Sequence, residues 1–409
     1  MLSTPRLLSI WLLCLVLAGI SAPAPADQAP GLSRQVYERL ETIHEQLEAG
    51  QASQAVDALR SLLAKSGLPA FDRAVLYETL GYAQAQREAY AAAATAFEQA
   101  LAQTDELPRE RRLGNLFNLA QMQYAAERPD AAVATLQRYL EQAPEPDNEA
   151  RLLLTKALLS LERWAAALEA IQPLLSGHPR PKTNWYRLQL LAQMELERYT
   201  DAAQTLHTLL RREPAKTEYW RHLAAVYTRA GKDAKAAAVL ELMWQRGQLT
   251  EHEAIKALAM RQIELNNPHR AAEILTEALA KGQLPASVRH LKWLARAWLL
   301  AREEAKAREV LARAAPKASH GKLYLRLAQL EYEREQWPAV AKAARAALAK
   351  GRLRHPGQAH LLLGIAQYHQ GNLAAARNAL QAARNDQRSR QAAQGWLQHL
   401  EQQTATSEP

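Results

Sequence analysis

The sequence predicts an all-α fold, a solenoid of about ten helix-turn-helix units with a C-terminal capping helix. Three observations support this: apolar residues recur at helical spacing, an alanine marks each second helix, and prolines fall at a fixed interval. Residues 218–240, EYWRHLAAVYTRAGKDAKAAAVL, show the unit. Trp220, Leu223, Ala224 and Tyr227 recur at steps of three and four residues. They therefore share one face of a helix.

A second helix follows Gly231, with Ala236 and Leu240 on one of its faces. A single hairpin cannot bury its apolar face, so copies are expected at a fixed period. The alanine recurs in nine of ten copies: Ala55, Ala93, Ala132, Ala167, Ala202, Ala236, Ala271, Ala307, Val340 and Ala376. The position four residues later is always apolar: Leu59, Phe97, Leu136, Ile171, Leu206, Leu240, Leu275, Leu311, Ala344 and Leu380.

The first helix carries a small residue where the second helix approaches it. This position reads Gly81, Ala120, Ala224, Ala259, Ala295, Ala328 and Gly364, with Ile43, Thr155 and Leu190 as exceptions. Pro144, Pro179 and Pro214 lie 35 residues apart, each where a second helix should stop. The units are expected to begin near residues 36, 74, 113, 148, 183, 217, 252, 288, 321 and 357.

The N-terminal segment has the pattern of a signal peptide. Arg6 precedes an apolar run at 7–20, and Ala24-Pro25-Ala26 has the spacing that a signal peptidase reads. The run is short for a membrane span, so we expect cleavage and export, with an uncleaved anchor in the inner membrane as the alternative. The expected order is a signal peptide at 1–26, a linker at 27–35, the solenoid at 36–386, the capping helix at 387–403 and a flexible tail at 404–409.

The residues give no sign of catalytic chemistry. Cys14 is the only cysteine and lies in the signal run, which excludes disulfides and thiolate metal sites from the mature chain. His252-Glu253 begins like a zinc-protease motif, but Lys256 occupies the place of the second histidine. Glycine-rich phosphate loops and nucleophile motifs are missing from the sequence. We therefore expect a non-enzymatic protein with no catalytic residue, no metal and no cofactor.

The charge changes along the chain. Residues 27–150 hold 11 Lys and Arg against 19 Asp and Glu, a net charge of −8, whereas residues 281–400 hold 21 against 7, a net charge of +14. Nucleic acid would suit a basic array, but export and the lack of a nucleic-acid motif exclude it. An acidic polypeptide and an anionic membrane surface stay open as partners. The interpretation that Lys and Arg merely solvate an alanine-rich surface stays open as well.

The ten units in register resemble the tetratricopeptide repeat (TPR), which implies a right-handed solenoid that binds a protein or peptide. In that family the second, fifth, ninth, twelfth and thirteenth positions of a unit project into the concave groove. Carried over, the resemblance places these residues in a groove: Tyr82, Phe117, Tyr124, Asn184, Arg187, Arg221, Arg229, Lys256, Arg289, Lys292, Arg296, Tyr332 and Tyr368. Aromatic residues with arginine are common anchors for protein partners. Several of the tyrosines are equally suited to sealing helix contacts.

Three local strings narrow the resemblance: KTNWY at 182–186, EYW at 218–220 followed by LAAVY at 223–227, and HPGQA at 355–359 followed by LLLGIA at 361–366. With the signal peptide, they are similar to periplasmic TPR proteins associated with TonB-ExbB-ExbD systems. This implies an accessory scaffold for energy transduction to outer-membrane uptake, with a TonB, ExbB or ExbD component as partner. The alternatives are an adaptor for polysaccharide export or outer-membrane assembly, and a membrane-binding protein that uses its basic C-terminal third.

Overall fold

The computed structural model describes residues 31–103, 107–144 and 147–406. The signal peptide expected at 1–26 lies outside the described residues. Every regular element in the described part of the chain is an α-helix, so the prediction of an all-α fold is confirmed. The chain divides between Arg198 and Tyr199 into two compact parts of several repeats each, which are called the first unit and the second unit below.

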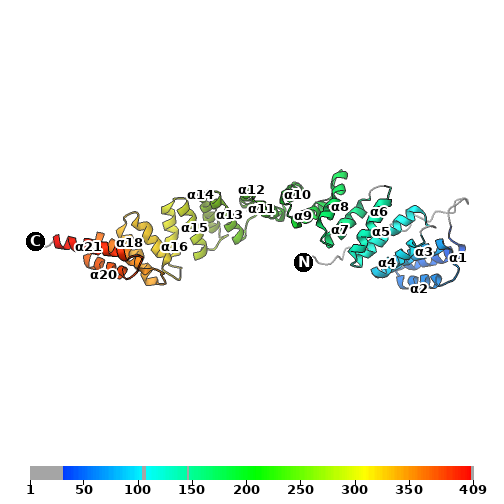
Figure 1. The fold of residues 1–409 in the computed structure, drawn as a ribbon, viewed down its shortest axis with the longest axis horizontal. Coiled ribbons are helices and arrows are strands. Elements are labelled where there is room, and N and C mark those ends of the chain that lie inside the picture. The colour runs from blue at the N-terminus through cyan, green and yellow to red at the C-terminus, as the bar shows by residue number, and fades with distance from the viewer. Residues whose placement is uncertain (1–30, 104–106, 145–146, 407–409) are drawn as a thin grey trace. The chain divides into compact units, whose positions relative to one another are not determined.

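The first unit consists of nine helices in its described residues, and each packs against the next along the chain (Figure 1). The helices are α1 (Arg34–Glu48), α2 (Ala52–Leu63), α3 (Ala70–Gln86), α4 (Tyr90–Leu101), α5 (Arg109–Ala125), α6 (Pro129–Gln142), α7 (Asn148–Ser160), α8 (Trp164–Gly177) and α9 (Thr183–Glu195).

The second unit continues the same alternation of first and second helices in its described part. The helices are α10 (Tyr199–Arg212), α11 (Thr217–Arg229), α12 (Asp233–Gln245), α13 (His252–Glu264), α14 (Pro268–Ala280), α15 (Val288–Leu300), α16 (Glu304–Ala314), α17 (Lys322–Tyr332), α18 (Trp337–Lys350), α19 (Pro356–His369), α20 (Leu373–Arg384) and α21 (Arg390–Thr406).

Some boundaries differ from those expected. Helices α3 and α5 begin at Ala70 and Arg109, four residues before the expected starts, and directly follow Pro69 and Pro108 at their N-caps. Helix α1 begins at Arg34, inside the expected linker. Helix α21 continues to Thr406, so it includes the first residues of the expected tail.

Every first helix ends with the same backbone turn. One residue there has φ between 55° and 77°, and these residues are Gly50, Glu88, Glu127, Glu162, Glu197, Gly231, Asn266, Arg302, Glu335 and Gly371. The next residue donates its backbone N–H to the carbonyl five residues earlier, as Lys232 does to Tyr227. This is the Schellman ending, which satisfies carbonyls that the helix leaves unpaired. Only three of the ten turns use glycine, so the ten repeats share the geometry of this turn more closely than its sequence.

The core follows the predicted register. The ten second-helix positions that read alanine, or valine at Val340, are at most 1% exposed. The position four residues later is at most 3% exposed in nine units, and Leu240 is the half-buried exception. Gly81 faces Phe97 and Gly364 faces Leu380, so the smallest first-helix residue meets a bulky second-helix side chain. The alanine register is therefore a packing pattern.

Candidate partner-binding surface

The best candidate for a binding surface lies on the first helices α11, α13 and α15 of the second unit. Ser287 caps α15 by accepting the backbone N–H of His290 at 3.4 Å. Leu291 and Leu294 are buried, and this orients Lys292 and Arg296 outward. Both cations are exposed and have no ion-pair partner among the described residues. They stand four residues apart, one turn of helix, and so form a neighbouring pair of positive charges.

Trp293 lies next to this pair, and two of the predicted cations pack against its ring. The Lys256 Nζ and the Arg289 Cζ each lie 5.1 Å from the centre of the Trp293 ring. Glu253 accepts from Lys256 at 3.3 Å and from Arg289 at 2.8 Å. The hydrogen bond from Lys256, followed by its charge and that of Arg289, lowers the pKa of Glu253. The cluster of Glu253, Lys256, Arg289 and Trp293 is called the tryptophan cluster below.

The remaining predicted cations of the second unit differ in their pairing. Arg221 on α11 forms an ion pair with Glu251, which precedes α13. Arg229 at the end of α11 is exposed and has no ion-pair partner among the described residues. Three of the six predicted cations, Arg221, Lys256 and Arg289, are therefore already neutralised in part. The cations that remain available are Arg229, Lys292 and Arg296.

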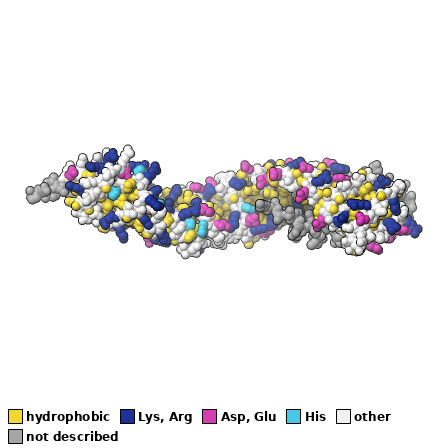
Figure 2. Space-filling view, turned by 90° about the horizontal axis from the view of Figure 1, so that it is seen from below, with side chains coloured by type: hydrophobic (Ala, Val, Ile, Leu, Met, Phe, Trp, Pro, Cys, Tyr) yellow, Lys and Arg dark blue, Asp and Glu magenta, His cyan; other side chains and the backbone are white. Residues whose placement is uncertain are grey.

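The aromatic residues predicted near the C-terminal end join a ring cluster on α17, α18, α19 and α21. Tyr332 meets Trp337 edge-on at 5.8 Å, and Trp337 stacks on His369 at 3.9 Å. Tyr368 contacts Trp396 at 5.4 Å, and its hydroxyl lies 2.9 Å from a ring nitrogen of His399. Figure 2 shows hydrophobic and histidine side chains gathered near this end. Tyr368 thus joins α19 to the last helix.

The aromatic residues predicted in the first unit hold helices together. The Tyr82 hydroxyl accepts from Asn118 at 2.7 Å, and the Tyr82 ring meets Phe97 edge-on. Burial, with the nearby Glu78 carboxylate, raises the pKa of Tyr82 to about 12. Phe117 packs on Tyr139 with ring centres 5.6 Å apart.

Tyr124 and the two predicted residues of α9 complete the list. Tyr124 is half-buried against the core of α5–α9, and burial raises its pKa. Asn184 and Arg187 are exposed on α9. Of the predicted groove residues in this unit, only these two are exposed.

The sequence analysis did not predict Trp293 as a groove residue. It occupies the sixth position of its repeat, which is not among the groove positions of the family. A signal was present, since Trp293 follows Arg289 by four residues and so lies on the same helical face. The described residues contain no group of three or more His, Cys, Asp or Glu that could hold a metal ion. In the part of the chain that the structure describes, no helix combines the length and apolarity needed to cross a membrane.

The repeat pattern has a counterpart among known families. The Tetratricopeptide repeat model matches residues 117–182, 187–245, 256–321 and 325–393, well over half of the chain. The chain belongs to the tetratricopeptide repeat family. TPR repeats imply a scaffold for protein–protein interaction, and the TPR fold is typically non-enzymatic. None of the curated proteins matches it significantly.

Solved structures with similar folds include other TPR proteins. A TPR protein from Parabacteroides merdae is 16% identical, with 65% of this chain and 99% of that chain covered and a TM-score of 0.39. The structure of Naa15/Naa10 bound to HypK-THB is 14% identical, with 88% and 65% covered and a TM-score of 0.49. YrrB, described as a TPR protein with an unusual peptide-binding site, is 14% identical, with 41% and 83% covered and a TM-score of 0.34.

Proposed function

We propose that this TPR protein is a non-enzymatic scaffold that binds an acidic segment of a protein partner on the first-helix surface of α11, α13 and α15. The tryptophan cluster supports this most directly. It places a large, half-buried ring 5.1 Å from each of two cations and beside Lys292 and Arg296, which have no ion-pair partner among the described residues. A ring supplies contact area and the free cations supply charge complementarity, the combination found at binding hot spots.

The charges around Trp293 favour an acidic segment with an apolar residue in it. Glu253 already neutralises part of the charge on Lys256 and Arg289, so the strongest attraction comes from Lys292 and Arg296. A partner carboxylate that approaches these two residues replaces water and not an existing ion pair. An apolar side chain next to it can then pack against the part of Trp293 that stays accessible to solvent.

We propose further that the scaffold is periplasmic and serves a TonB-ExbB-ExbD system as an accessory component. The support comes from the signal pattern at 1–26 and from the local strings at 182–186 and 355–366. The mature protein would then begin at Asp27 and fractionate with the periplasm. An intact mass that retains Met1 or carries a lipid would contradict this part of the proposal and leave the binding surface untouched.

Charge reversal tests the surface. Lys292→Glu with Arg296→Glu should abolish binding of a labelled peptide that alternates Glu with apolar residues, and of the purified periplasmic domains of TonB and ExbD if one of them is the partner. The matched control is Lys342→Glu with Arg345→Glu, two exposed second-helix cations of α18 with no ion-pair partner among the described residues. Equal losses in both double variants would refute the assignment of the surface.

Salt gives a second readout with wild-type protein. The Debye length falls from about 10 Å at 0.1 M salt to about 3 Å at 1 M, so attraction between exposed charges should weaken across that range. Trp293→Ala should reduce binding at every salt concentration, because it removes contact area and not net charge. Binding that is indifferent to salt would point to an apolar interface instead.

A further inference from the structure

We infer that a pocket in the first unit, distant in sequence from the proposed binding surface, binds a phosphate monoester. The pocket has a volume of about 470 Å³, within the range of small-molecule sites. It is formed by the C-terminal end of α4, the first turns of α5 and the last turns of α6. Its lining residues are Leu101, Arg109, Arg112, Leu116, Arg138, Glu141 and Gln142.

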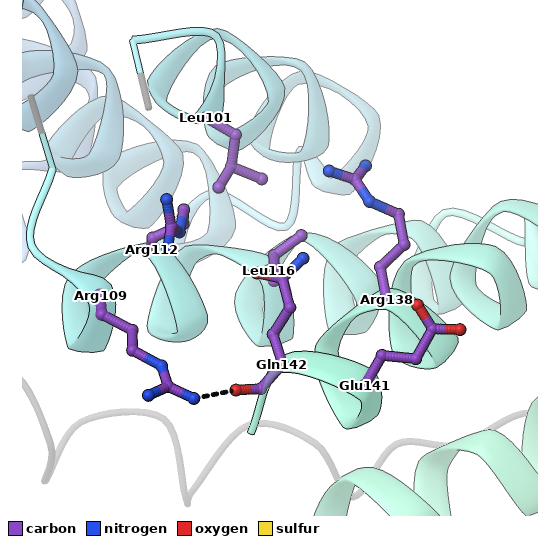
Figure 3. Close-up of a pocket in the computed structure, with 7 residues that line it drawn as sticks. All are labelled: Leu101, Arg109, Arg112, Leu116, Arg138, Glu141 and Gln142. Atoms are coloured by element: carbon purple, nitrogen blue, oxygen red, sulfur yellow. Dashed lines mark hydrogen bonds between the residues drawn. The ribbon is translucent and has the colours of Figure 1, made fainter. Parts of the chain in front are cut away.

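The arginines of this pocket have no acidic partner among the described residues. Arg109 donates to the backbone carbonyl of Gln142 at 2.7 Å, a neutral acceptor (Figure 3). Arg112 and Arg138 make no side-chain hydrogen bond or ion pair with any described residue, and neither does the one acid, Glu141. Elsewhere in this unit arginines do find acids, as Arg163 finds Asp130.

Arg112 provides the fixed point of the site. Its Nε is buried and has no hydrogen-bond partner. A ligand cannot reach an atom that has no accessible surface, so the donors open to a ligand are the two terminal guanidinium nitrogens, which make no hydrogen bond with a described residue. Figure 3 shows the guanidinium groups of Arg112 and Arg138 on either side of Leu101. Arg109 and Arg138 are exposed, and exposed side chains change rotamer readily, so both can turn toward a ligand held at Arg112.

The charge of the lining selects the ligand. Among the described lining residues, three arginines and one glutamate give a net charge of +2. A phosphate monoester carries about 1.5 to 2 negative charges at neutral pH and accepts bidentate hydrogen bonds from guanidinium groups. The pocket is larger than a phosphate ion, which leaves room for the ester group and favours an ester over inorganic phosphate.

Two control positions come from the repeat itself. Arg73 on α3 and Arg151 on α7 lie 39 residues before and after Arg112, at the same place in the first turn of their helices. Each also has a buried Nε without a partner, but neither lines this pocket. They share with Arg112 any structural effect of that position and differ from it in the proposed ligand.

Calorimetric titration of the full chain with glycerol 3-phosphate tests the inference, with inorganic phosphate and succinate as comparison ligands. We expect saturable binding, weaker binding of phosphate, and none of succinate. Arg112→Gln should weaken binding about tenfold or more, because it removes a charge-assisted fork. Arg138→Gln should weaken binding too. Because Arg138 is exposed, this variant should fold, so it tests the inference even if the Arg112 variant does not fold. Arg73→Gln should leave binding unchanged.

Vesicles that contain phosphatidic acid distinguish a lipid headgroup from a soluble ester. Binding to these vesicles that depends on Arg112 would assign the same phosphate chemistry to a lipid. The inference is overturned if neither glycerol 3-phosphate nor the vesicles bind, if succinate binds as well as the ester, or if Arg73→Gln weakens binding as much as Arg112→Gln. None of these outcomes bears on the surface around Trp293.

Discussion

Gly81→Ala tests the packing pattern where it is tightest. A Cβ built on Gly81 would lie 2.7, 2.8 and 2.9 Å from three atoms of the Phe97 ring. Carbon atoms in contact prefer about 3.5–4.0 Å, so the ring would have to move by roughly 0.8 Å or more. Phe97 is 1% exposed, and the Tyr82 ring stands edge-on against it at 5.3 Å, so the ring has little space to move into.

Two effects of opposite sign act on the free energy of unfolding of this variant. Overpacking a core contact costs about 1–3 kcal/mol. Replacing a helical glycine by alanine returns about 1 kcal/mol through helix propensity. Gly81→Ala should therefore lower the free energy of unfolding by about 0–2 kcal/mol, and the propensity gain must be measured separately.

Gly114→Ala on α5 measures that gain in the same unit. Gly114 is helical and exposed, and a Cβ there would meet no atom within 4 Å. This variant should be more stable than wild type by about 1 kcal/mol. The difference between the two variants then isolates the overpacking cost, about 1–3 kcal/mol. Urea denaturation followed by circular dichroism gives both values, and equal stabilisation by both substitutions would refute the packing argument.

A second substitution checks that Phe97 is the cause. Phe97→Leu shortens the side chain opposite Gly81 and by itself should destabilise the protein through a cavity. In the Gly81→Ala background the new methyl group fills part of that space, so the second substitution should cost less. A double-mutant cycle with strictly additive effects would show that the two positions do not meet.

Three further predictions follow from the core, the turns and the histidines. Ala236→Leu should lower the free energy of unfolding by about 1–3 kcal/mol, because Ala236 is 0% exposed between helices; a melting temperature equal to wild type would contradict the register. Glu127→Gly should raise it by up to about 1 kcal/mol, because Glu127 has φ 58° and only glycine adopts that conformation freely; denaturation of this variant against wild type decides the sign. Burial is the main cause that lowers the pKa values of His44, His207 and His360 in the folded protein. As the pH falls, the unfolded chain therefore binds protons at a higher pH than the folded protein does. The stability that these residues contribute is complete above about pH 6.5 and lost below it, and replacing all three by Gln should flatten the decline in melting temperature between about pH 7 and 5.

The fold could be predicted from the sequence because it depends on side-chain volume at a fixed period. Ala55 and Ala376 are both 0% exposed at opposite ends of the register, and the alternation between them needs no long-range information. The turns were less predictable. A residue with positive φ ends every first helix, but Glu127 and Arg302 fill that position in two of them and neither residue type favours it.

The helix starts show a second limit. The sequence placed the starts of α3 and α5 at the first strongly periodic residues, but the helices begin earlier, directly after Pro69 and Pro108. Six of the eight residues in the extra turns are charged, so the apolar pattern does not record these turns. One of these residues is Arg112, which lines the pocket of the first unit.

The candidate site was harder to predict because binding depends on which polar groups are already satisfied. Arg221 and Lys292 occupy the same position of their units, yet Glu251 pairs with Arg221 and no described residue pairs with Lys292. Such pairing joins side chains of neighbouring units, so it is fixed only when the helices are placed. Charge counted along the sequence cannot separate a cation that is neutralised from one that is available.

The same reasoning separates the aromatic residues of the two units. Tyr82 in the first unit is half-buried, packs edge-on against Phe97 and accepts a hydrogen bond from Asn118, so it serves to hold helices together. Trp293 in the second unit lies 5.1 Å from each of two cations whose shared carboxylate, Glu253, leaves them one positive charge in excess. A partner that brings a carboxylate to this ring meets attraction without first breaking a hydrogen bond of the core. For this reason the binding prediction rests on Trp293 and its neighbours, and the stability prediction rests on the contact between Gly81 and Phe97.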